Sequence, residues 1–253
     1  MEIILNETEW TVNQINKREM CKDAYSMFRR IARYYLDKGY DKEETLARME
    51  RFLMTAKPEA SPVRWNEMME RALAHAQKQP AVDVGSIMVT VPEMETIKAL
   101  KGKQLQRLAF TLLCISKFWN LYSAKNDSWV RTPDNEIMRY ANIKTSVMRQ
   151  SLLYHSLIEA GLIRMPKKVD NTNVKVEFAQ EGDAALVIED FRNLGYQYLM
   201  YIGEPYFRCE RCGVVTRLKN PNGGRPQKYC VSCAVQAKTE QSVNAVMRQR
   251  GGK

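Results

Sequence analysis

Apolar residues recur at three- and four-residue spacing along three stretches of the first 80 residues, a periodicity typical of amphipathic helices. The second stretch follows Asp41, which has a carboxylate three residues later at Glu44, and the third follows Ser61-Pro62. Both patterns mark a helix start, because the capping side chain accepts a free backbone N–H and proline fits the first turn. Residues 1–80 are therefore predicted to form a helical domain.

The charges of this domain are mixed. Acidic residues are interspersed along the chain with the basic residues Arg29, Arg30, Arg33, Lys38 and Lys42. Blocks of like charge mark a face for a polyanion, whereas mixed charges are typical of a solvated surface. We interpret these residues as a mixed solvated surface, with a basic face on the helices as the alternative.

The pattern changes after residue 80. Residues 86–91 read Ser-Ile-Met-Val-Thr-Val, and their β-branched side chains favour the extended state. A short strand is expected here, followed by a short helix, within a linker that spans residues 81–102. The sequence shows no repeat of fixed period and no low-complexity segment.

Three helical patterns and two strand patterns follow from residue 103. Their order is a helix over 103–119, a helix introduced by Thr132-Pro133-Asp134, a helix from near Thr145 to Gly161, and strands over 162–165 and 173–178. Apolar spacing supports the helices, and glycine readily adopts the left-handed conformation that ends one. The segment between the two strands is basic and rich in turn-forming residues.

Three helices and a two-stranded hairpin over residues 103–179 resemble a winged helix-turn-helix domain. The phrase Ser156-Leu-Ile-Glu-Ala-Gly-Leu-Ile-Arg164 is similar to the end of the recognition helix running into the wing in that family. We expect this domain, with a C-terminal extension, to cover residues 103–204. The fold class implied for the whole chain is mainly α with small β.

The resemblance implies that the beginning of the third helix enters the major groove of DNA. The residues that it places toward DNA are Lys144, Thr145, Ser146, Arg149 and Gln150 in the helix, and Lys167 and Lys168 in the wing. Arg149 and Gln150 would read bases, because their side chains match guanine and adenine, and the wing lysines would meet phosphate. Alternatively, the domain packs against another protein or a second copy of itself.

Two Cys-x-x-Cys pairs near the C-terminus carry the most specific chemical signal. Cys209 and Cys212 are separated by 17 residues from Cys230 and Cys233, the spacing of a four-cysteine zinc site. Residues 205–234 resemble a zinc ribbon. Because four cysteine ligands leave no open coordination position, the Zn²⁺ is expected to be one structural ion.

Two other chemistries are open to these cysteines. Disulfides are the first alternative, but the chain begins without the basic and apolar segments of a signal peptide, and a cytoplasmic protein keeps its thiols reduced. Redox catalysis by Cys-x-x-Cys is the second, and it requires a thioredoxin-like βαβ context that the sequence lacks. A zinc site in a cytoplasmic protein is therefore the expectation.

Basic residues are concentrated at the same end. The formal net charge is +10, and residues 205–253 contain ten basic residues against two acidic ones, which favours a polyanionic partner. Phosphate contacts are expected from Arg217, Lys219, Arg225 and Lys228, on the hairpin between the two cysteine pairs. The alternative is a solvated basic segment, and residues 235–253 are expected to be a basic tail.

The remaining composition gives no sign of a membrane protein or of an enzyme. No apolar run is long enough for a membrane helix, so no membrane partner is expected. The two histidines, His75 and His155, fall in different modules without an acidic cluster of ligand spacing, so no enzyme active site is predicted.

Together, these patterns predict a nucleic-acid-binding protein whose expected partner is DNA. The combination resembles proteins of phages and mobile elements that act in transcription regulation or DNA replication. The alternative function is a protein-interaction factor that binds and modulates a host polymerase, replication or defence protein. A homodimer or a host protein partner is compatible with either function.

Overall fold

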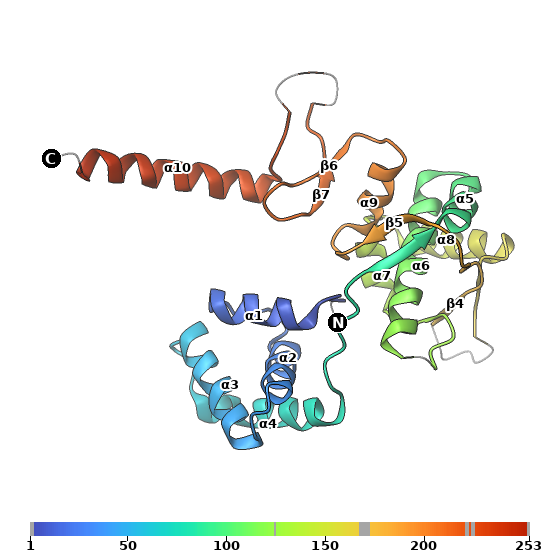
Figure 1. Cartoon of the computed structure of the whole chain (residues 1–253). Helices are drawn as coiled ribbons and strands as arrows, with labels where there is room; N and C mark the ends of the chain where they lie inside the picture. The colour runs from blue at the N-terminus through green and yellow to red at the C-terminus, as the bar shows by residue number, and fades with distance from the viewer. Residues whose placement is uncertain (1–2, 124, 167–172, 221–222, 224–225, 252–253) are drawn as a thin grey trace. The chain divides into compact units, whose positions relative to one another are not determined.

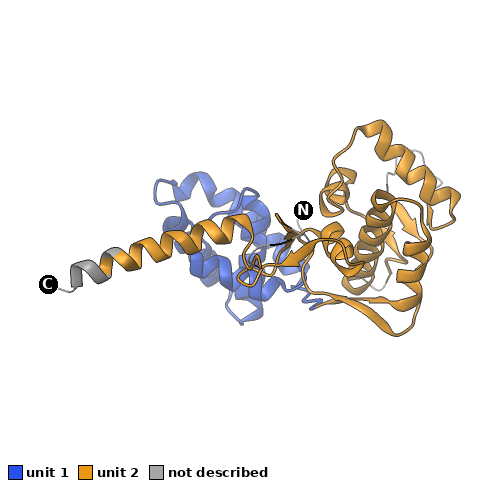
Figure 2. Ribbon diagram, turned by 90° about the horizontal axis from the view of Figure 1, so that it is seen from above, with its two compact units in different colours: residues 1–85 blue, residues 86–253 orange. Residues whose placement is uncertain are grey.

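The computed structural model describes residues 3–123, 125–166, 173–220, 223 and 226–251, and these are mainly helical with small antiparallel sheets (Figure 1). The expected fold class, mainly α with small β, is confirmed at this level. The chain forms two compact units, residues 1–85 and residues 86–253 (Figure 2).

Unit 1 is an all-helical unit. Its helices are α1 (Glu7–Lys17), α2 (Ala24–Asp37), α3 (Lys42–Ala56) and α4 (Pro62–Lys78). The core between α2, α3 and α4 is formed by apolar side chains such as Phe28, Met49 and Leu73, all fully buried. The Asp41 side chain accepts a hydrogen bond of 2.8 Å from the backbone N–H of Glu44, which confirms the predicted start of α3.

The interpretation of the basic residues in unit 1 as a solvated surface was wrong for two of them. Arg30 and Arg33 are only 5% and 2% exposed. The Arg33 guanidinium donates to Glu7 at 3.0 Å, and Arg30 lies 3.7 Å from the same carboxylate. Burial of a guanidinium is tolerated because an acidic side chain from α1 compensates its charge.

Unit 2 begins at a strand. Its elements are β1 (Ile87–Thr90), α5 (Val91–Ala99), α6 (Lys103–Tyr122), β2 (Trp129–Val130), α7 (Asp134–Tyr140), α8 (Val147–Glu159), β3 (Ile163–Arg164), β4 (Val174–Val176), β5 (Ala184–Ile188), α9 (Leu194–Tyr201), β6 (Tyr206–Arg208), β7 (Val215–Arg217) and α10 (Val231–Gly251). β1 pairs antiparallel with β5, with Ile87 opposite Ile188. Residues 86–102, assigned to a linker from the sequence, therefore belong to unit 2, because β5 completes a sheet with them.

The middle of unit 2 is built around α6, whose residues from Leu108 to Ser116 are buried. The helices α7 and α8 follow, and a three-stranded antiparallel sheet has the order β2-β4-β3. Trp129 is opposite Lys175, and Ile163 is opposite Val176. The strand β2, which the sequence pattern did not predict, pairs with the outer edge of the predicted hairpin.

The end of unit 2 consists of α9, the β6–β7 hairpin and α10. In β6–β7, Tyr206 is opposite Arg217. The helix α10 runs to Gly251, where a basic tail was expected, and its described side chains beyond Ala237 are exposed. Among the residues that the structure describes, no helix is both long and apolar enough to cross a membrane.

Candidate metal centre

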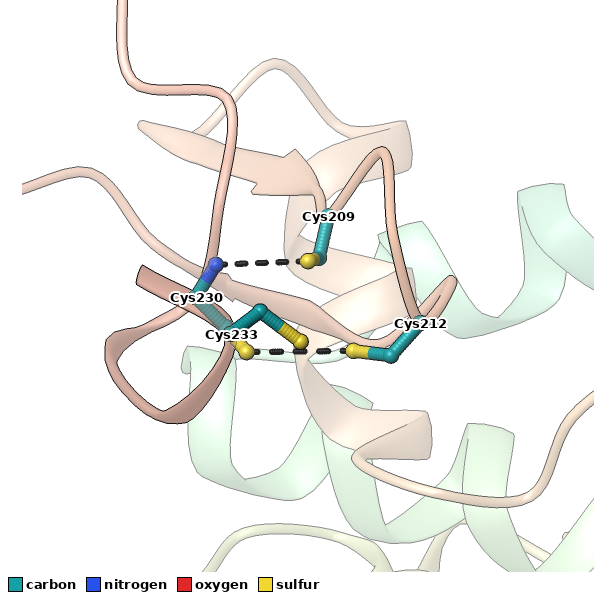
Figure 3. Close-up of side chains that lie close together, drawn as sticks. All are labelled: Cys209, Cys212, Cys230 and Cys233. Atoms are coloured by element: carbon teal, nitrogen blue, oxygen red, sulfur yellow. Dashed lines mark hydrogen bonds between the residues drawn. The ribbon is translucent and has the colours of Figure 1, made fainter. Parts of the chain in front are cut away.

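The four cysteines come from both ends of the β6–β7 module. Cys209 and Cys212 flank the turn after β6, Cys230 directly precedes α10, and Cys233 lies in its first turn. Their four sulfur atoms all lie within 4.8 Å of one another, and the sulfurs of Cys212 and Cys230 are 3.7 Å apart (Figure 3). Four ligands at about 2.3 Å in a tetrahedron are separated by about 3.8 Å, so the cluster can hold one metal ion.

Backbone hydrogen bonds shape the first cysteine pair into a tight turn. The Gly213 N–H donates to the Cys209 carbonyl at 2.9 Å, and the Cys209 N–H donates to the Val214 carbonyl at 3.0 Å. Gly213 has a φ of 73°, a left-handed conformation that glycine adopts without strain. This turn directs both cysteine sulfurs to the same side.

The two pairs are also joined directly. The Cys230 N–H donates to the sulfur of Cys209 at 3.3 Å, a contact drawn in Figure 3. The Glu210 N–H donates to the Lys228 carbonyl at 3.0 Å. All four thiols are free of disulfide bonds.

The local environment divides the thiols into two kinds. Burial raises the pKa of Cys209, but backbone N–H groups, first that of Cys230, outweigh it and lower the pKa to about 6. A hydrogen bond with Ser232 lowers the pKa of Cys230. Burial raises the pKa of Cys212, and it is the first cause that raises the pKa of Cys233 to about 12. Because thiolates and not thiols bind a divalent metal, its binding releases the protons that the four thiols still hold.

The cluster is anchored to the rest of unit 2 by side chains just before α9. Arg192 donates to the Cys212 carbonyl at 2.8 Å, and Asn193 donates to the Val215 carbonyl at 3.0 Å. The rings of Tyr196 and Tyr206 stack with centroids 4.8 Å apart. The small cysteine module is thus supported by α9 as well as by its own turns.

The second cysteine pair continues into α10. The Arg211 guanidinium makes two hydrogen bonds, of 2.6 and 3.0 Å, to the carboxylate of Glu240 on this helix. The Ala234 N–H donates to the Cys230 carbonyl at 2.9 Å. Two contacts therefore connect α10 to the cysteine module. Cys233 lies in the first turn of the helix, and Glu240, about two turns further along, binds Arg211.

The residues predicted to read DNA surround the beginning of α8. Ser146 caps the helix, accepting from the Arg149 N–H at 3.4 Å, and Lys144 and Arg149 are exposed. Gln150 is half-buried, and its amide donates to the Thr145 carbonyl at 3.1 Å, so part of its hydrogen-bonding capacity is used within the chain. The wing residues Lys167 and Lys168 lie outside the described residues.

The second predicted set lies beside the cysteines. Arg217 is exposed on β7, Lys228 lies 3.5 Å from Glu210, and Arg225 falls outside the described residues. A groove of about 720 Å³ runs along this module, and its lining includes Phe207, Leu218, Lys219, Lys228 and Tyr229. The structure therefore brings Lys219 and Lys228 together in one groove. Among the described residues, no hydrogen bond or ion pair connects these two lysines to the start of α8.

Two groups of side chains at the candidate sites were not singled out from the sequence. The anchors Arg192 and Asn193 follow no motif, and only their position before a helix near the cysteine module could have suggested them. The exposed apolar residues of α8 were readable as a pattern: Val147, Met148 and Leu152 are 77%, 78% and 56% exposed. Their spacing places them on the helix surface that does not contact the core.

Comparison of the chain with protein-family models, curated proteins and solved structures gives no match.

Proposed function

We propose that the protein binds nucleic acid, with duplex DNA as its main partner, through a winged helix in residues 103–179 and a zinc ribbon in residues 205–234. The order α6-β2-α7-α8-β3-β4, with a three-stranded sheet, supports the first assignment. The four-cysteine cluster with its β6–β7 hairpin supports the second. By resemblance, the role is in transcription regulation or replication of a phage or mobile element.

The metal of this proposal is one structural Zn²⁺. Thiolates are soft ligands, and four of them in a tetrahedron suit zinc or iron. Zinc is preferred over iron because Zn²⁺ has no redox chemistry and typically forms closed, structural sites with four cysteines. Metal analysis of reduced, purified protein tests the assignment: about one zinc per chain is expected, and one iron instead would replace zinc in the proposal.

The observation that carries the DNA proposal is the exposed beginning of α8. Ser146 caps the helix, and Lys144 and Arg149 stand free in solvent next to that cap. A helix N-terminus attracts phosphate, and a free guanidinium can donate two hydrogen bonds to guanine in the major groove. The groove with Lys219, Lys228 and Tyr229 adds cations and an aromatic ring for further backbone contact.

Fluorescence anisotropy with labelled duplex DNA tests the proposal. Binding should weaken steeply between about 50 and 200 mM salt, because phosphate contacts release counterions. Arg149→Ala should weaken it about tenfold or more, whereas Lys101→Ala, which removes one positive charge from an exposed site before α6, should have little effect. Equal affinities for these two variants would contradict the role of α8.

The apolar residues of α8 favour a second candidate function, the docking of a protein. Val147, Met148 and Leu152 form an exposed apolar surface beside the same helix start. Such surfaces commonly mark protein interfaces. Under this alternative, the double variant Met148→Ser/Leu152→Ser would convert a homodimer to a monomer in sedimentation experiments, or abolish binding to a host protein, while Arg149→Ala would change neither.

A further inference from the structure

A groove in unit 1 has a lining unlike that of its mixed outer surface. It lies between the end of α1, the end of α2 and the middle of α3, three helices that Figure 1 shows in blue. Its volume is about 300 Å³, and its lining residues are Ile15, Asn16, Arg18, Tyr35, Arg48, Arg51, Phe52 and Thr55. A volume of this size suits a small ligand.

The cations of the groove have no acidic counterpart. Arg18, Arg48 and Arg51 line it, and the described lining includes no carboxylate. Within the part of the chain that the structure describes, these three arginines make no ion pair. Three guanidinium groups beside one hollow produce a positive potential that selects an anion.

Aromatic rings surround the same cations. The Arg48 guanidinium carbon lies 3.8 Å from the ring centroid of Tyr40 and 5.3 Å from that of Tyr35. The two rings pack edge to face with centroids 5.8 Å apart. Both tyrosines are half-buried, so each keeps a part of its surface for contact with a ligand.

A second hollow, of about 250 Å³, extends the groove. It shares Ile15, Asn16, Tyr35 and Arg48 with the first and adds Val12, Tyr34, Lys38 and Tyr40. The Lys38 ammonium lies 5.8 Å from the ring centroid of Tyr34. The two hollows therefore adjoin at shared residues, and both are lined by cations and by aromatic rings.

We propose that this groove binds a phosphate-bearing nucleotide, either free or as part of a single strand. A nucleotide carries both of the groups that the lining recognises. Phosphate oxygens accept from guanidinium groups, and a flat base packs against tyrosine or arginine. In this arrangement Arg18 and Arg51 hold phosphate, and Tyr35, Tyr40 and Arg48 provide the stacking surface.

This site lies in unit 1 and is independent of the DNA contacts proposed for unit 2. Photochemical cross-linking of the full chain locates it directly, with a 12-nucleotide oligo(dT) that contains 5-iododeoxyuridine as the probe. Mass spectrometry of the cross-linked peptides should find Tyr34, Tyr35 or Tyr40. Absence of cross-links in residues 12–55 would overturn the proposal, whatever happens at α8.

Two variants test the cations. Arg51→Gln changes an exposed side chain, and Arg48→Gln removes the guanidinium over the tyrosines. Each should lower cross-linking in the groove about tenfold or more, because Arg51→Gln removes a charged donor to phosphate and Arg48→Gln removes a part of the stacking surface. Arg64→Gln, an exposed site in the same unit but outside the groove, is the matched control. Equal yields in all three variants would refute the proposed site.

Thymidine monophosphate as a competitor distinguishes the two sources of the ligand. Loss of groove cross-links at millimolar competitor would identify a site for free nucleotides. Retention of these cross-links, combined with their loss in Arg51→Gln, would identify a site for a single strand. Cross-links in unit 2 should be unchanged by the groove variants, so the failure of one site is distinguishable from failure of the other.

Discussion

The side-chain amide of Asn142 donates a hydrogen bond of 2.9 Å to the side-chain oxygen of Asn193. Both residues have left-handed backbone conformations, with φ of 55° and 56°. Asn142 follows α7 and accepts at its carbonyl from Arg107 of α6, and Asn193 donates to Val215 of β7. This pair therefore connects the helices before α8 to the strand beside the cysteines.

Close packing reinforces the connection. Gly195, in the first turn of α9, lies so near Ala141 that a Cβ atom would be 2.0 Å from the Ala141 carbonyl oxygen. A side chain at this position would force the backbones apart. The cysteine module and the helices around α6 are thus joined at one closely packed junction.

Replacement of Asn193 tests this junction. Asn193→Ala should destabilise unit 2 by about 2 kcal/mol, because alanine loses both side-chain hydrogen bonds and is strained in the left-handed region. Asn193→Gly loses the same hydrogen bonds without the strain, so it should be less destabilising. Urea denaturation of both variants measures the difference, and an unchanged stability for Asn193→Ala would show that the junction contributes little.

Metal removal should unfold only part of unit 2. A small module around a metal has too little apolar core to fold alone, so chelation should abolish hydrogen-exchange protection in residues 206–234. The first turn of α10 contains Cys233 and should lose protection as well, whereas α6 should stay protected.

Cysteine variants provide the control for this experiment. Cys212→Ser should lower the bound metal and reproduce the effect of the chelator. Cys21→Ser, in unit 1 and outside the cluster, should keep a full metal content. Wild-type protein with far less than one metal ion per chain would contradict a structural metal.

The buried ion pair of unit 1 should be important for stability. Glu7→Ala leaves Arg30 and Arg33 buried without their carboxylate, so we expect a loss of about 3–5 kcal/mol. The matched control is Glu67→Ala, which removes an exposed carboxylate that pairs with Arg71 at 3.9 Å and should cost less than about 1 kcal/mol. Similar unfolding free energies for the two variants would show that the buried pair is not special.

His75 should make the stability of unit 1 depend on pH. Burial, followed by the charges of Arg29 and Arg33, lowers the pKa of this histidine. The unfolded chain therefore takes up a proton more readily than the folded one. The contribution of neutral His75 is fully present above about pH 6.5 and decreases as the pH falls below that value.

The measurement compares unit 1 at pH 7 and at pH 5 by hydrogen exchange. His75→Gln should reduce the loss of protection between these two pH values, because glutamine does not titrate. His155→Gln, an exposed site on α8 in unit 2, should behave like wild type. An identical pH dependence in His75→Gln and wild type would exclude His75 as the titrating group.

Local patterns were sufficient for many elements of this protein. The helix start at Asp41 depends on a side chain that accepts from its own backbone three residues on, so nearby sequence contains the whole interaction. Ser61 also precedes a helix as predicted, but its side chain makes no capping hydrogen bond. The cysteine cluster is similar: each Cys-x-x-Cys pair places its two sulfurs together through a local turn. Only the meeting of the two pairs requires the fold, and their spacing already indicated it.

Pairings between distant segments were not readable in the same way. The strand β5 is partly exposed and has no clear alternation, so its pairing with β1, about 100 residues earlier, follows from packing. The groove of unit 1 combines three helices, and its arginines look ordinary in sequence. Arg33 was wrongly predicted to be solvated, because a charged residue on a helix is usually exposed, whereas the structure buries it.

By itself, the sequence predicted a mainly helical fold, helix starts such as the one at Asp41, and the four cysteines that come together, because these depend largely on interactions within a few residues. The tertiary structure decided which charges are buried, as for Arg33 and Glu7, and how the cysteine module is held, through Asn142 and Asn193. Those contacts join residues 26 and 51 positions apart. They form only when the packing of whole helices brings the two segments together, and no local pattern encodes that meeting.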